Sequence, residues 1–103
     1  MKIGQNAIEN TKRTFRDRLK EARENAGYTQ AQLAERCNEV TAMTIHRWER
    51  GETEPSIIYL SMLCNLLHVK ADWLLGLSEI KPYETKRYDS VMAKLKAIVE
   101  EGE

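Results

Sequence analysis

Between Gly27 and Gly51 the chain reads GYTQAQLAERCNEVTAMTIHRWERG. Thr29, followed three residues later by Gln32, has the pattern of a capping box. In this motif the hydroxyl and the amide side chain satisfy free backbone groups at the start of a helix. We therefore expect a short helix over residues 30–37.

A tight turn separates this helix from the next. The segment 38–40, Asn-Glu-Val, has no helical periodicity, and Asn38 tolerates a left-handed backbone at low cost. Thr41 can then cap a second helix over residues 42–50, and the glycine that follows can close it in the left-handed conformation. Two short helices joined by such a turn form the helix-turn-helix arrangement.

The flanking sequence predicts further helices and no strands. We expect an all-α fold, a five-helix bundle over residues 14–77. A basic N-terminal arm, residues 1–13, precedes it, and residues 78–103 supply a linker and a C-terminal amphipathic helix near 86–100. Core-facing stripes are predicted at Phe15, Leu19, Ala22 and Ala26 in the first helix, and at Ile57, Leu60, Leu63, Cys64 and Leu67 in a fourth helix capped by Ser56. A fifth helix over 71–75 stops at Gly76.

Composition favours one globular domain. The 103 residues are 42% hydrophobic and 31% charged, with a net charge of +0. Residues 1–20 nevertheless hold six basic and two acidic side chains, which suits either a polyanion partner or an ordinary solvated terminus. No apolar run approaches the ~20 residues of a membrane span, and we expect no secretory leader and a cytoplasmic location.

The sequence offers no catalytic or metal-binding motif. It contains no glycine-rich phosphate loop, paired-carboxylate site or nucleophile elbow, so we expect a protein that is not an enzyme and has no cofactor. Cys37 and Cys64 form no CxxC pair, and with His46 and His68 they match no zinc-ligand spacing. We expect both thiols to be reduced core residues.

Several motifs together resemble a known family. They are Arg23, GYTQAQLA over 27–34, IHRWERG over 45–51, Pro55 and DWLLG over 72–76. In this order they are similar to the Cro/C1-type (XRE-like) helix-turn-helix family of phage and bacterial repressors. The resemblance covers about residues 14–77 and implies a lambda-repressor-like DNA-binding domain. In this chain the turn is one residue longer than usual, and His46 replaces a common serine.

The resemblance also implies roles for individual residues. Gln30 would contact phosphate, and Arg50 would lie near the DNA backbone. Thr41, Ala42, Met43 and Arg47 would lie at the major groove, with Thr44 and His46 flanking them. Arg23 and Glu49 would form a structural ion pair between the first and third helices.

These roles imply a sequence-specific regulator that binds double-stranded DNA in the major groove, with repression expected. A palindromic operator and a homodimer would supply more contacts than one short helix can. The alternative is an antitoxin-like or adaptor module whose partner is a protein. An apolar stripe in the C-terminal segment would either form the dimer or pack on its own domain: Val91, Leu95, Ile98 and Val99.

Overall fold

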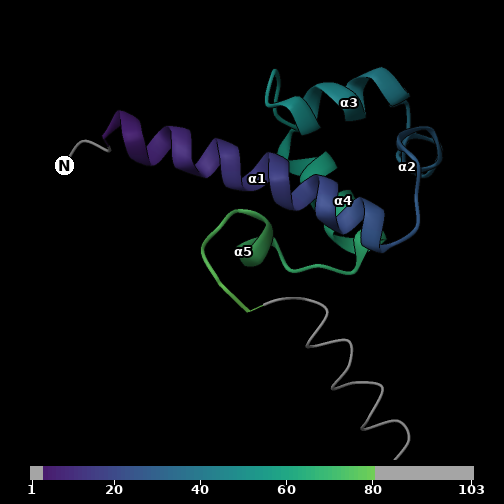
Figure 1. The fold of residues 1–103 in the computed structure, drawn as a ribbon. Coiled ribbons are helices and arrows are strands. Elements are labelled where there is room, and N and C mark those ends of the chain that lie inside the picture. The colour runs from purple at the N-terminus through teal and green to yellow at the C-terminus, as the bar shows by residue number, and fades with distance from the viewer. Residues whose placement is uncertain (1–3, 81–103) are drawn as a thin grey trace, which may run out of the picture.

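The computed structural model describes residues 4–80, which form five helices and no strand (Figure 1). The helices are α1 (Gln5–Asn25), α2 (Gln30–Arg36), α3 (Ala42–Arg50), α4 (Ile57–Leu67) and α5 (Ala71–Leu74). The predicted all-α fold is confirmed. The predicted C-terminal helix and its apolar stripe lie outside the described residues. Within residues 4–80, no helix is long and apolar enough to cross a membrane.

Local side-chain signals set the helix ends. The amide of Gln32 donates to Thr29 Oγ1 at 3.1 Å, and the amide of Thr29 donates to Gln32 Oε1 at 2.9 Å, so the predicted capping box is complete. Thr41 and Ser56 begin α3 and α4, each accepting a hydrogen bond from the amide three residues later. Gly51 closes α3 in the left-handed conformation, with φ of 75°. Both helices of the motif therefore start where their sequences direct, and α3 also stops there, while α2 ends at Arg36, one residue before the predicted end.

One fully buried aliphatic side chain from each helix builds the centre of the core. These side chains are Leu19, Leu33, Ile45, Leu63 and Leu74. Burying a leucine or isoleucine contributes ~1.5–3 kcal/mol. Helix α1 contacts α3 and α5, which lie on opposite sides of it (Figure 1), while α2 packs on α3 and α4 packs on α5. The shared core fixes α3 relative to the rest of the bundle.

Helix α1 begins nine residues earlier than the predicted start of the bundle at residue 14. Residues 5–13, placed in an arm by the sequence, form the first half of α1, which projects beyond the other helices (Figure 1). These residues are exposed and have no apolar stripe, so periodicity alone does not reveal the helix. Extending an existing helix adds one hydrogen bond per residue without a new nucleation cost. A pair at i, i+4 spacing supports the extension, since Gln5 Nε2 donates to Glu9 Oε1 at 2.9 Å.

Three finer expectations were wrong. Ala26 lies just past α1 and is exposed, because the chain already leaves the helix toward Gly27. Ile57 is 85% exposed, since it is the first residue of α4 and precedes the part of that helix that packs on the core. In the turn between α2 and α3 the left-handed residue is Glu39, with φ of 56°, and not Asn38. The carbonyl of Asn38 accepts from the Tyr59 hydroxyl at 2.7 Å, and the next residue reverses the chain.

Candidate nucleic-acid interface

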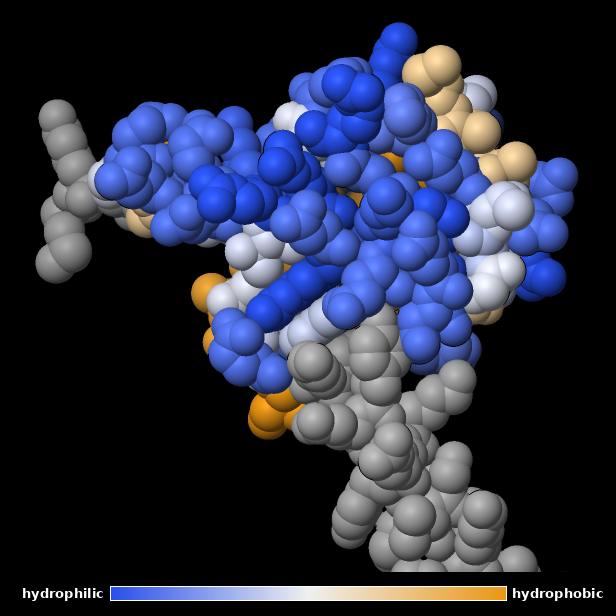
Figure 2. All heavy atoms as spheres, viewed as in Figure 1, coloured by the Kyte–Doolittle hydropathy of each residue, from blue (hydrophilic) through white to orange (hydrophobic). Residues whose placement is uncertain are grey.

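Helix α3 presents one face away from the core. Ile45 and Trp48 are buried beneath it, while Met43 is 56% exposed. Of the predicted contact residues, Thr41, Met43, Arg47 and Arg50 are exposed, and Ala42, Thr44 and His46 are half-buried. The surface over α1 and α3 is mainly hydrophilic in the view of Figure 2. The structure therefore gathers the predicted α3 residues on one short, accessible helix.

The hydroxyl of Thr41 has a structural use. Thr41 Oγ1 accepts from the amide of Thr44 at 3.3 Å and lies 3.2 Å from Thr44 Oγ1. A hydroxyl offers one donor and two acceptor positions, so capping leaves capacity for a further contact. The cap also sets the direction in which α3 begins.

Gln30, at the start of α2, is tied to α3. Its Nε2 donates to Glu49 Oε1 at 3.2 Å and lies 3.4 Å from His46 Nδ1. A carboxamide nitrogen carries two hydrogens, so one can hold Glu49 while the other serves a second acceptor. Sequence reasoning placed Gln30 near phosphate but did not foresee this contact. It depends on how α2 packs on α3.

A buried ion pair links α1 to α3. Arg23 Nε donates to Glu49 Oε2 at 2.6 Å and Arg23 Nη2 donates to Glu49 Oε1 at 3.0 Å, a bidentate geometry. The side chains of Arg23 and Glu49 are only 10% and 4% exposed. Arg23 Nη1 also donates to the carbonyl of Tyr28 at 2.8 Å, beside the start of α2. The hydrogen bond to Glu49 raises the pKa of Arg23 despite the opposing effect of burial. Together with the Gln30–Glu49 hydrogen bond, the pair joins α1, α2 and α3.

Acidic side chains lie beside the C-terminal end of α3. Arg50 Nε is 3.1 Å from Glu52 Oε1, and both side chains are exposed. Such surface pairs are weak because water screens them, so Arg50 can exchange its partner for a phosphate.

Within residues 4–80, no group of three or more His, Cys, Asp or Glu side chains could hold a metal ion.

The arrangement now has a match among known families. The model of a family described as Helix-turn-helix covers residues 19–74, from the last third of α1 to the end of α5. The chain belongs to the Cro/C1-type helix-turn-helix family. The matched range includes the ion pair, the capping box and the whole outward face of α3.

Two curated relatives from Bacillus subtilis (strain 168) share this part of the chain. The HTH-type transcriptional regulator ImmR is 43% identical over 63 residues, which are 61% of this chain and 49% of ImmR. The SPbeta prophage-derived uncharacterized HTH-type transcriptional regulator YonR is 36% identical over 61 residues, 59% of this chain and 56% of YonR. The chain thus spans about half the length of these relatives. No solved structure matches it.

Proposed function

We propose that this chain is a sequence-specific DNA-binding transcriptional regulator, acting as a repressor in the cytoplasm, and that α3 reads the major groove. The observation that carries the proposal is the contrast between the two faces of α3. Glu49 anchors the inner side through a buried bidentate pair, whereas Met43 and Arg47 are exposed. A major groove ~12 Å wide admits one helix, and a rigidly held helix can place side chains against base edges. The free thiols of Cys37 and Cys64 suit a reducing compartment.

Each predicted residue has a distinct role in this proposal. Arg47 pairs with a guanine, the commonest specific contact. Met43 and Ala42 pack on thymine methyl groups or let the helix approach closely. Gln30 uses its second amide hydrogen on a backbone phosphate, while Arg50 contacts the flanking backbone. The hydroxyls of Thr41 and Thr44 and the ring of His46 flank the reading positions.

Substitution of Arg47 tests base reading. DNA sites would first be selected from a randomised duplex pool with the wild-type protein. Arg47→Ala should weaken binding to the selected site by ~1–3 kcal/mol and relax the preference at one base pair. Arg47→Lys keeps the charge but loses the planar fork, so it should lose selectivity while retaining non-specific affinity. Lys70→Ala is the control, because Lys70 directly precedes α5, on the opposite side of α1 from α3 (Figure 1). Gln30→Ala should weaken binding to all sequences more evenly, because phosphate contacts carry no base identity. If both variants bind as the wild type does, α3 does not read the DNA.

A salt titration separates DNA binding from the protein-interaction alternative. Groove binding releases counterions from DNA, so wild-type affinity for a random duplex should fall steeply as salt rises. Absence of salt-dependent duplex binding would favour an antitoxin-like or adaptor module instead. For a regulator, a promoter carrying the selected site should drive less reporter expression when the chain is present. Increased expression would make it an activator.

We further propose a homodimer on a palindromic operator. Two copies spaced ~34 Å apart would place two α3 helices in successive major grooves of the same DNA face. Removing the residues after Glu79 removes the apolar stripe of the C-terminal segment. Sedimentation should then report a monomer, and circular dichroism should show that it stays helical. Its affinity for the operator should fall. A truncated chain that stays dimeric and binds as tightly would show that the dimer forms elsewhere.

A further inference from the structure

A groove lies between the projecting half of α1 and the end of α3. Its volume is about 180 Å³, and its lining is Glu9, Lys12, Arg13 and Arg16 from α1 with Gly51 from the turn after α3. The four α1 residues stand at i, i+3, i+4 and i+7, which places them on one side of the helix. The volume is more than ten times the ~10–15 Å³ of such space that one water molecule needs, which leaves room for a phosphate group.

Three of the four charged side chains that line the groove are cationic. The fourth, Glu9, is acidic, and its Oε1 accepts a hydrogen bond from Gln5 Nε2 at 2.9 Å. Two further acidic groups make only exposed contacts with the groove: Lys12 Nζ is 3.8 Å from Glu54 Oε1, and Arg16 Nε is 3.6 Å from Asp17 Oδ1. Water screens such pairs, so they hold their partners weakly. The arginines and the lysine can therefore turn to a stronger anion, and guanidinium groups match the oxygens of a phosphate in a bidentate fashion.

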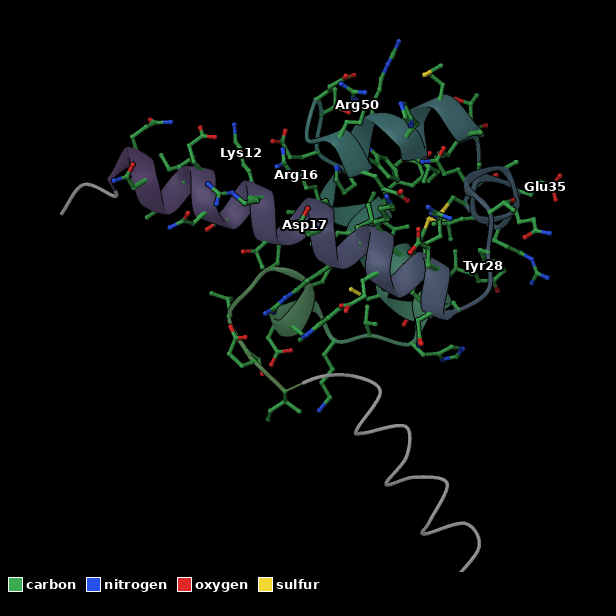
Figure 3. All side chains as sticks on the ribbon, in the orientation of Figure 1. Lys12, Arg16, Asp17, Tyr28, Glu35 and Arg50 are labelled. Carbon is green, nitrogen blue, oxygen red and sulfur yellow. The ribbon has the colours of Figure 1, made fainter. Side chains whose placement is uncertain are left out.

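Gly51 brings the turn after α3 close to the Arg16 side chain. A Cβ atom added at this position would lie 3.2 Å from Arg16 Cδ, tighter than an ordinary contact. The same glycine closes α3, so the groove starts where the outward face of α3 stops. Figure 3 shows Lys12 and Arg16 projecting from α1 on the side where α3 lies, with Arg50 at the near end of α3.

We propose that this groove binds a phosphodiester of the DNA backbone beyond the base pairs read by α3. The inference rests on the proposed function and extends it to the first half of α1, which residue periodicity alone does not predict to be helical. At ~1.5 Å per residue, α1 is ~30 Å long. A helix of this length can follow the flank of a duplex whose major groove holds α3. The contact would add affinity without reading sequence, because phosphates carry no base identity.

The test compares the full-length chain with the double variant Lys12→Gln/Arg13→Gln on a random-sequence duplex of ~40 base pairs, about four helical turns. Each neutralised phosphate contact lowers the slope of log affinity against log salt by ~0.9. The double variant should therefore lose ~2 units of slope and bind at least ~10-fold more weakly at ~0.1 M salt. Lys70→Gln is the control that removes one positive charge away from the groove, and its slope should equal that of the wild type. Circular dichroism checks that the variants fold.

The possible failures are distinguishable. A wild-type slope near zero would overturn both the proposed function and this site. A steep wild-type slope that the double variant retains would overturn the groove alone. Inorganic phosphate is a second probe. If it raises the Tm of the wild type but not of the double variant, while the DNA slopes stay equal, the groove serves free phosphate and the DNA assignment is wrong.

Discussion

Removing Glu49 should destabilise the chain more than almost any exposed substitution. Its carboxylate accepts two hydrogen bonds from Arg23 and one from Gln30, and its side chain is 4% exposed. Glu49→Leu leaves the Arg23 guanidinium buried without its counter-charge, at an expected cost of ~3–5 kcal/mol. A small domain has ~5–15 kcal/mol of stability in total, so much of it would be lost.

A double-mutant cycle separates the stranded charge from the loss of packing. Arg23→Met combined with Glu49→Leu removes both charges, so it should cost less than either single change. A remaining loss of ~1–3 kcal/mol is expected, because the Tyr28 carbonyl and the Gln30 amide lose partners. The coupling energy between the two sites should then exceed ~2 kcal/mol.

Urea unfolding followed by circular dichroism measures all four free energies, provided that the slope against urea stays constant across the variants. A single variant that costs under ~1 kcal/mol would refute the reasoning, because it would mean that water reaches the pair. A double variant that loses the sum of the two single losses would also refute it, since additive losses mean that the charges do not interact.

Three further outcomes follow from backbone angles and from the two cysteine thiols. Glu39 and His68 both have φ of 56°. Replacing either with glycine should therefore raise the free energy of unfolding by ~0.5–1 kcal/mol, measured as a higher urea midpoint. Gly51→Ala should lower the Tm, because φ is 75° there and the added Cβ meets a neighbouring side chain at 3.2 Å. Burial raises the pKa of Cys37 and Cys64, so the unfolded chain releases these protons first and stability should fall as pH rises above ~8.5. Urea midpoints that stay equal from neutral pH to above pH ~8.5 would contradict this prediction. So would midpoints that fall equally far when both cysteines are replaced by alanine, because the thiols would then not cause the loss.

Local chemistry in the sequence was enough to determine the helix-turn-helix. Thr29 with Gln32, Thr41 and Gly51 act within one helical turn of their own positions, so their effects do not depend on distant segments. Apolar periodicity placed Leu19 and Leu63 on inner faces for the same reason. The resemblance to the Cro/C1-type family then predicted a pair between Arg23 and Glu49, and the structure places them within bonding distance.

Apart from the Arg23–Glu49 pair, only the tertiary structure decided the contacts between segments far apart in the chain. Gln30 meets Glu49 across 19 residues, and Lys12 and Arg16 line one groove with Gly51, which is more than 30 residues away in the chain. Such contacts depend on how α1, α2 and α3 pack, which no local pattern encodes. The start of α1 was missed because an exposed, polar helix half carries no apolar stripe. Sequence therefore determined the helix-turn-helix and most of the buried apolar residues, while packing decided which polar side chains meet and where a groove forms.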